Sequence, residues 1–197
     1  AKRLPQTIEA HNEKPSTFSV IHQDALHLKA LPEEPTVLVA NLPYNVSVPV
    51  LLHLLEIFPT LKSGVVMVQA EVADRLAAKP GTKEYGIPSV KAAWWADLHG
   101  AGSISRSIFW PIPGVDSKLV SFTRHQPMGD EALRLKVFTL IDAAFAQRRK
   151  MLRSALSSIY GSSGAAEKVL IEAGIDPTLR GESLQVNDFC TIARIGF

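Results

Sequence analysis

The chain has 197 residues, 46% of them hydrophobic and 20% charged, so it can bury a sizeable core and is not expected to be disordered or fibrous. Its net charge of +2 permits nucleic-acid binding without demanding it. The longest apolar runs are far shorter than a membrane span, and the N-terminus has no secretory signal pattern. One cysteine excludes an internal disulfide, and six histidines without paired spacing predict no metal site. We therefore expect a cytoplasmic protein with no bound metal and no membrane contact.

The first 125 residues alternate strand and helix patterns, as is typical of an α/β sheet. The apolar run at 36–40 predicts a strand buried on both faces, as in parallel sheets. Ser47 is a plausible N-cap of the next helix, and Pro49 suits its first turn. The strands at 98–103 and 118–124 flank one loop and predict an antiparallel pair. In chain order, we expect helices at 2–11, 47–57, 71–78 and 88–96, and strands at 17–21, 36–40, 64–68, 98–103 and 118–124.

The remainder of the chain predicts a second unit that is entirely helical. No strand pattern follows Asp130. We place the boundary within 126–129, which divides the chain into a unit at 1–125 and a helical unit at 126–197. Within the second unit we expect helices at 132–153, 165–173 and 186–195.

One expected feature is not visible in the sequence. A doubly wound nucleotide-binding sheet normally opens with a strand, a glycine-rich turn, a helix and a second strand that ends in an acidic residue. This chain begins without Met and shows none of these, so we expect its sheet to lack the first two strands.

Asn41-Leu42-Pro43-Tyr44 follows the buried strand, at the end where open α/β sheets bind ligands. The Asn41 side-chain oxygen and the Leu42 carbonyl could accept both N–H bonds of an exocyclic amine and direct its lone pair at a methyl group, without a strong base. Pro43 would fix the backbone, and Tyr44 offers a ring for stacking a base. Taken alone, such a tetrapeptide is more often an ordinary strand-to-loop sequence.

The tetrapeptide and four further blocks, in the same order along the chain, resemble KsgA-type ribosomal RNA adenine dimethyltransferases. This resemblance implies a Rossmann-like S-adenosylmethionine methyltransferase sheet, incomplete at its N-terminus, followed by a small helical domain that recognises RNA. It also implies S-adenosyl-L-methionine as methyl donor, ribosomal RNA in the small subunit as partner, and action as a monomer. The further blocks lie at 67–76, 83–86, 109–117 and 144–153.

The resemblance also implies roles for individual residues. Asp24 and Ala25 match the positions that bind the adenine of the cofactor, together with Asn41 and Pro43, although Asp24 could equally form an ordinary turn at a strand end. Phe109 matches the aromatic residue that sandwiches the target base opposite Tyr44. Family members more often have lysine where this chain has a glycine at position 114, so a phosphate contact is not expected there.

Basic residues in the last block suggest an RNA-binding surface. Arg148, Arg149, Lys150 and Arg153 would form a broad basic arc on one helix, with Phe145 and Leu152 facing the core. For an arbitrary basic tetrad a solvated helix face is the better interpretation, but the resemblance favours RNA contact. Further candidate phosphate contacts are Arg75, Lys79 and Lys83.

Two alternatives remain open at this point. Without a glycine-rich turn, the chain could bind RNA or the ribosomal subunit only, with no measurable affinity for the cofactor. It could also be a resistance methyltransferase of the large subunit, which shares the fold. The complete block at 144–153 favours the small-subunit enzymes.

Overall fold

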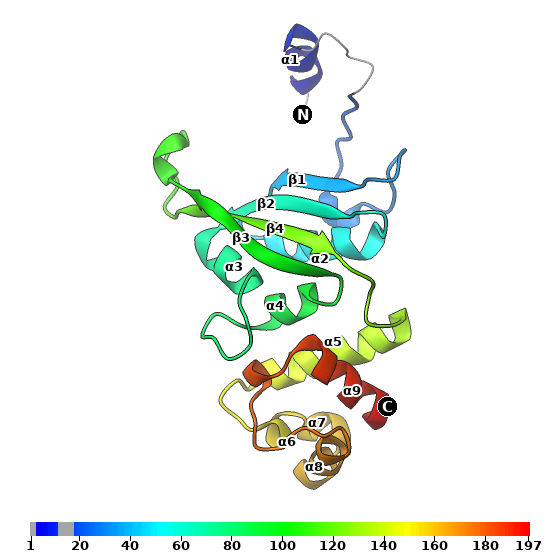
Figure 1. Cartoon of the computed structure of the whole chain (residues 1–197). Helices are drawn as coiled ribbons and strands as arrows, with labels where there is room; N and C mark the ends of the chain where they lie inside the picture. The colour runs from blue at the N-terminus through cyan, green and yellow to red at the C-terminus, as the bar shows by residue number, and fades with distance from the viewer. Residues whose placement is uncertain (1–2, 12–17) are drawn as a thin grey trace.

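The computed structural model describes residues 3–11 and 18–197 and shows a mixed four-stranded sheet with helices below it (Figure 1). The strand order is β1-β2-β4-β3, with β1 parallel to β2 and the other two pairs antiparallel. The expected α/β fold and its antiparallel edge pair are therefore confirmed. The strands are β1 (Val37–Asn41), β2 (Ser63–Gln69), β3 (Ala96–Ile104) and β4 (Ser117–Arg124).

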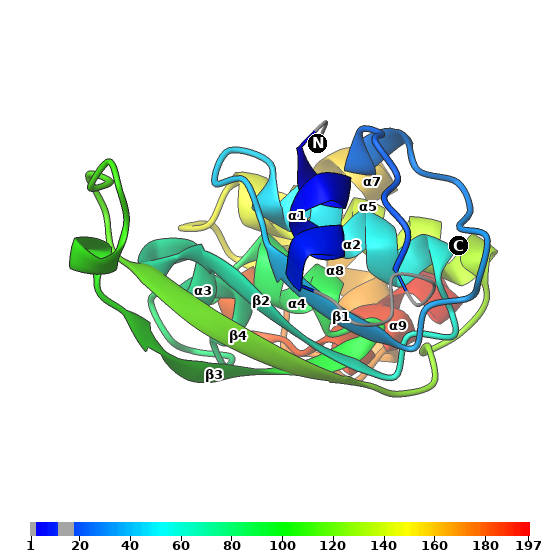
Figure 2. The ribbon, with the colours of Figure 1, turned by 90° about the horizontal axis from the view of Figure 1, so that it is seen from above.

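The register brings the candidate site to one end of the sheet. Asn41, the last residue of β1, lies opposite Met67, and Gln69 at the end of β2 pairs with Ser117 at the start of β4. Ser117 also pairs with Ile104 at the end of β3. The carboxyl ends of β1, β2 and β3 therefore lie at the same end of the sheet as the first residue of β4, and the loop that joins β3 to β4 projects beyond them, at the left of Figure 2.

One face of the sheet packs on helices that follow its strands. Alternate residues of β2, Val66 and Val68, are fully buried, as a strand with one covered face requires. Figure 1 shows the covering helices on the lower side of the sheet. They are α2 (Ser47–Ile57), α3 (Ala70–Leu76) and α4 (Ile87–Ala92).

The opposite face is more open than the sequence suggested. Val37 is 58% exposed and Val39 is 80% exposed, so the prediction that this strand is buried on both faces was wrong. The reason is that β1 is an edge strand and, in the part of the chain that the structure describes, no helix packs on these two side chains.

The N-terminal expectations have mixed outcomes. A helix is confirmed as α1 (Leu4–His11), while residue 2 lies outside the described residues. The strand expected at 17–21 was wrong over 18–21, which has no regular secondary structure, and residue 17 is not described. A strand needs a neighbouring ladder, and among the described residues no strand lies beyond the outer edge of β1.

The start of α2 also differs from the prediction. Val46 is the N-cap and Ser47 is the first helical residue, buried and donating from its hydroxyl to the Tyr44 carbonyl at 3.3 Å. Ser47 therefore links the helix to the turn that carries Tyr44, instead of capping the helix.

The long helix expected at 132–153 is interrupted. It forms α5 (Glu131–Ala146), leaves helical geometry at Gln147 and resumes as the short α6 (Leu152–Ala155). The backbone N–H groups of Leu152 and Arg153 donate to Leu179 and Pro177, at 2.7 and 3.2 Å. In a continuous helix these two N–H groups would donate to the carbonyls four residues earlier in the chain, so the tertiary bonds replace two helical bonds.

The helical unit packs under α4 through one shared core. Trp94 and Trp95 contact Phe138 of α5 edge to face, and the buried residues of both parts form a single hydrophobic cluster. The division at 126–129 stays a prediction. Among the described helices, none is both long and apolar enough to cross a bilayer. The remaining helical elements are η2 (Ala25–His27), η3 (Arg106–Ile108), α7 (Ser157–Tyr160), α8 (Ser163–Glu172), η4 (Gly181–Ser183) and α9 (Val186–Gly196).

Candidate active site

The predicted tetrapeptide and Phe109 line one cavity of about 400 Å³ at the carboxyl ends of the strands. Two segments that are far apart in the sequence form its walls, the turn after β1 and the loop between β3 and β4. The structure thus brings together the five residues that the sequence singled out for base binding. The lining residues are Asn41, Leu42, Pro43, Tyr44, Phe109, Trp110, Pro111 and Pro113.

The sheet itself holds the first wall in place. The Leu42 N–H donates to the Met67 carbonyl at 3.1 Å, which extends the ladder one residue beyond β1, and the Leu42 side chain is buried. The Val46 N–H then donates to the Pro43 carbonyl at 3.2 Å and closes a turn. Because Leu42 points into the core, the neighbouring Asn41 side chain points outward and is exposed beside the cavity.

Tyr44 is tied to the second wall by a hydrogen bond. Its hydroxyl lies 2.7 Å from the Ser117 hydroxyl, and Ser117 is fully buried at the start of β4. The bond fixes the tip of the ring. Sequence reasoning included Ser117 in a family block but assigned it no role, because only the fold brings residues 44 and 117 together.

Charged side chains close the base of the loop that carries Phe109. Arg106 pairs with Asp116 at 3.2 Å and donates to the Gly114 carbonyl at 3.2 Å. Directly after Ser117, Lys118 pairs with Asp74 of α3 at 2.7 Å. The two pairs anchor both sides of Ser117, so the loop leaves the sheet at a defined position.

Asp24 and Ala25 do not line this cavity. The Asp24 carboxylate caps η2, accepting from the Leu26 N–H at 2.9 Å, and lies 3.1 Å from His27 Nδ1. The hydrogen bond from Leu26 holds the pKa of Asp24 below its usual value. The turn expected as the alternative for Asp24 is therefore present, and its cofactor contact stays a prediction. The carboxylate is exposed and keeps free acceptor positions.

The sequence predicted that the basic residues at 148–153 lie on one helix, and this was wrong. They lie in the turn between α5 and α6 and at the start of α6. Arg148 is exposed but engaged by the protein: it pairs with Glu182 at 2.8 Å and donates to the Lys83 carbonyl at 2.6 Å. Arg153 lies 3.3 Å from Glu167. Within the described part of the chain, no ion pair engages Arg149 or Lys150.

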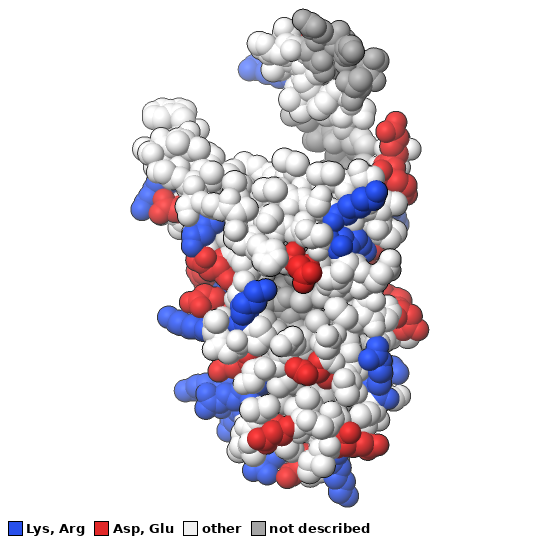
Figure 3. All heavy atoms as spheres, viewed as in Figure 1, with Lys and Arg blue, Asp and Glu red and all other residues white. Residues whose placement is uncertain are grey.

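The other predicted phosphate contacts lie on the same edge of the molecule. The bond from Arg148 places the loop between α3 and α4, which contains Lys79 and Lys83, against the turn between α5 and α6. Figure 3 shows Lys and Arg side chains along this left edge, interspersed with Asp and Glu. Arg75 at the end of α3 is paired with Glu71 at 2.6 Å. None of these side chains lines the cavity at Asn41.

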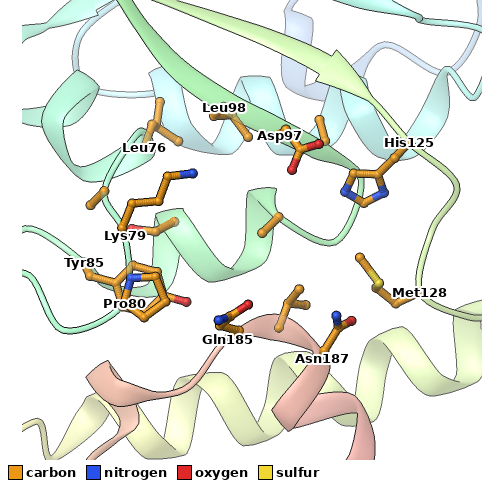
Figure 4. A pocket seen from close by; sticks show the side chains of 15 residues that line it. Leu76, Lys79, Pro80, Tyr85, Asp97, Leu98, His125, Met128, Gln185 and Asn187 are labelled. Atoms are coloured by element: carbon orange, nitrogen blue, oxygen red, sulfur yellow. The ribbon is translucent and has the colours of Figure 1, made fainter.

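A second cavity, of about 280 Å³, lies between the sheet unit and the start of α9. Figure 4 shows Lys79, Asp97, His125, Gln185 and Asn187 around it, so Lys79 faces this space rather than the cavity at Asn41. Among the described residues, no group of three or more His, Cys, Asp or Glu side chains is arranged to hold a metal ion.

Comparison with known proteins gives one family. The model of the family "Ribosomal RNA adenine dimethylase" matches residues 1–196. A ribosomal RNA small subunit methyltransferase A of Streptomyces avermitilis is 56% identical over 196 residues, covering 98% of this chain and 66% of the relative. The protein of the same name from Leifsonia xyli is 57% identical over 196 residues, with 98% and 70% covered. The chain thus spans about two thirds of the length of the curated relatives it matches.

Solved structures support the fold. A dimethyladenosine transferase from Plasmodium falciparum superposes with a TM-score of 0.78 at 21% identity, over 97% of this chain and 76% of the other. The 23S rRNA methyltransferase ErmE superposes with a TM-score of 0.67 at 20% identity, over 100% of this chain and 77% of the other. At these identities the similarity establishes the Rossmann-like methyltransferase fold alone.

Proposed function

Because the chain belongs to the ribosomal RNA adenine dimethylase family, we propose that it methylates N6 of two neighbouring adenosines in small-subunit ribosomal RNA, with S-adenosylmethionine as methyl donor. The cavity shared by Asn41, Tyr44 and Phe109 is the observation that carries this proposal. A flipped or unpaired base fits between two aromatic side chains, and nucleobase-modifying enzymes generally bind the base in this way.

The residues around the cavity can orient the amine without a strong base. The lone pair of an aromatic amine is delocalised into the ring, so the amine is a poor nucleophile until it is pulled toward tetrahedral geometry. The Asn41 side-chain oxygen and the Leu42 carbonyl would accept its two N–H bonds, while Tyr44 holds the ring by stacking. The bond from Ser117 to Tyr44 keeps that stacking surface in place before RNA arrives.

The residues present fit part of the methyl donor. Asn41 and Pro43 would contact its reactive end, and the exposed carboxylate of Asp24, beside Ala25, would accept from its adenine amine. When bound, S-adenosylmethionine supplies an electrophilic methyl group on a sulfonium. The cationic sulfonium would also be favoured by the face of the Tyr44 ring.

The RNA backbone would lie along the edge that carries Lys79, Lys83, Arg149 and Lys150, which we call the basic edge. We assign phosphate contacts first to Arg149 and Lys150, whose charges are not engaged within the described protein, and second to Lys79, Lys83, Arg75 and Arg153. Arg148 would act mainly by holding the loop at 79–84 in position. The protein would act on the ribosomal subunit as a monomer in the cytoplasm, where ribosomal subunits assemble.

The proposal is tested by incubating the protein and labelled S-adenosylmethionine with small subunits that lack this modification. Dimethyladenosine should form on small subunits and not on large subunits, as measured by mass spectrometry of RNA digests. Asn41→Ala should lower turnover by about 100-fold, because one of two positioned acceptors is lost. Asn45→Ala, an exposed asparagine outside the cavity lining, is the matched control and should be unchanged.

RNA binding without methylation is the alternative function, because Arg149 and Lys150 could contact RNA independently of the cavity at Asn41. Calorimetric titration with S-adenosylmethionine separates the two. Micromolar binding of S-adenosylmethionine supports the enzymatic function. If the protein binds ribosomal subunits but titration with S-adenosylmethionine gives no heat of binding, only the binding function remains.

A further inference from the structure

The loop between β3 and β4 exposes large apolar side chains at its tip. Trp110 is 95% exposed, Ile108 70% and Ile112 62%. The other two tryptophans of the chain, Trp94 and Trp95, are buried. An almost fully exposed Trp beside two exposed Ile residues is unusual for a protein surface and indicates a binding site.

Trp110 lies at the mouth of the candidate active site. It lines the same cavity as Asn41 and Tyr44. Phe109 is half-buried and has extended backbone geometry, and the adjacent Trp110 is exposed at the rim of the same cavity. An RNA strand that places one base against Phe109 would bring the next base within reach of Trp110.

The loop is anchored well enough to display Trp110 at a defined place. Arg106 joins Asp116 and the Gly114 carbonyl, which closes the loop at its base. Ser117, directly after the loop, bonds to Tyr44. The same hydrogen-bonded segment therefore supports both the loop with Trp110 and the Tyr44 ring.

We propose that Trp110 stacks on an unpaired base next to the target adenosine, so that the site holds two successive bases of single-stranded RNA. This inference rests on the proposed function. The occupant is RNA rather than lipid or protein because the tip continues into a cavity lined by Tyr44 and Phe109, and because the turn between α5 and α6, which carries Arg149 and Lys150, lies on the same side of the molecule as this loop (Figure 1). Stacking on aromatic side chains accepts any base.

Intrinsic fluorescence tests the inference directly, because Trp110 is the one tryptophan of the chain that solvent and RNA reach. The probe is an RNA hairpin whose loop contains two neighbouring adenosines, titrated without any methyl donor, with anisotropy of a labelled hairpin as an independent measure of binding. We expect quenching of the Trp110 emission. A hairpin that is abasic next to the target adenosine should bind roughly 10-fold more weakly and quench less.

Three variants identify stacking as the cause. Trp110→Phe should lose the quenching but bind within about threefold of the parent protein, because phenylalanine still stacks. Trp110→Leu keeps an apolar side chain without a ring and should bind roughly 10-fold more weakly. Trp94→Phe should retain the quenching in full. Since Trp110 makes few contacts in the fold, its variants should unfold at the same temperature as the parent.

The inference is overturned if saturating hairpin does not quench Trp110, if the abasic hairpin binds equally well, or if Trp110→Leu binds like the parent. It is also overturned if vesicles of phosphatidylcholine and phosphatidylglycerol, and not RNA, shift the emission. Quenching without methylation would refute the proposed function and leave the stacking role intact. Normal methylation and KM in Trp110→Leu would refute the stacking role alone.

Discussion

Tyr44 connects the two segments that form the candidate active site. Its ring lies on the turn after β1, and its hydroxyl bonds to Ser117, the residue that follows the loop carrying Phe109 and Trp110. At the scale of single residues, base binding thus depends on a ring and on one buried hydroxyl that orients it. The two contributions can be separated by substitution.

Tyr44→Ala should lower methyl transfer to small-subunit RNA by about 10- to 100-fold, because a stacking surface is lost from the transition state. Tyr44→Phe keeps the ring and loses only the bond to Ser117, so its loss should be a few-fold and reproduced by Ser117→Ala. Combining Tyr44→Phe with Ser117→Ala should add nothing further. Single-turnover assays give the methyl-transfer rate of each of these four variants relative to the parent protein. Full activity of Tyr44→Ala would contradict the stacking role.

At the scale of elements, the first turns of α5 attach the helical unit to the sheet unit. Arg134 is nearly buried, bonds to Glu131 at 2.6 Å and to Glu56 of α2 at 2.8 Å, and lies over the rings of Trp95 and Phe138. The hydrogen bond from Arg134 lowers the pKa of Glu131. Replacing the guanidinium leaves the two carboxylates without their shared partner.

Arg134→Leu should lower the free energy of unfolding at pH 7 by about 1–3 kcal/mol, as expected for lost charged hydrogen bonds. Because the pKa of the Glu131 carboxyl is lower in the folded protein, the charged carboxylate stabilises the fold at pH values above its pKa in the unfolded chain, about 4.3. This stabilisation disappears as the pH falls through the pKa of the folded state. The difference between Arg134→Leu and the parent should therefore shrink below pH 4. Urea titrations at pH 7 and pH 3.5 measure it, with Glu131→Gln as the variant that removes only the titrating group. A difference that does not depend on pH would contradict the role of Glu131.

At the scale of the whole molecule, the basic edge combines both units. The turn between α5 and α6 and the loop at 79–84 are held together by Arg148, and the loop between β3 and β4 projects on the same side of the protein (Figure 1). A single hydrophobic core passes through both units, so this arrangement is held by packing as well as by charge. An RNA strand at the cavity could therefore contact both units at once.

We expect weaker binding to small-subunit RNA in both Arg149→Ala and Lys150→Ala, since each substitution removes a phosphate contact. In each variant, the slope of the logarithm of the binding constant against the logarithm of the salt concentration should become shallower by about one. Lys168→Ala, an exposed lysine on α8, is the control and should leave the slope unchanged. Filter binding between about 50 and 200 mM salt measures the slopes. Equal slopes for all four proteins would place the RNA backbone elsewhere.

The sequence alone determined the features that depend on neighbouring residues. The apolar runs predicted β1, β2 and the β3-β4 pair, and the helix patterns predicted α2, α8 and α9 to within a few residues. Asn41-Leu42-Pro43-Tyr44 was placed at a strand end from its position after an apolar run, and the ordered blocks indicated the family that the comparison confirmed. Backbone preference and side-chain periodicity are local, so they can be interpreted without a fold.

Only the tertiary structure decided features whose partners are distant in the chain. Leu152 donates to Leu179, and Arg148 bonds to Lys83, so the predicted long helix ends early and Arg148 is engaged by a loop distant in the sequence. The bond between Tyr44 and Ser117 likewise follows from how the strands are ordered, and the exposure of Trp110 was visible only in the structure. A hydrogen bond or a packed contact depends on what lies within a few ångströms in space, and local patterns carry no information about residues 30 or 70 positions away.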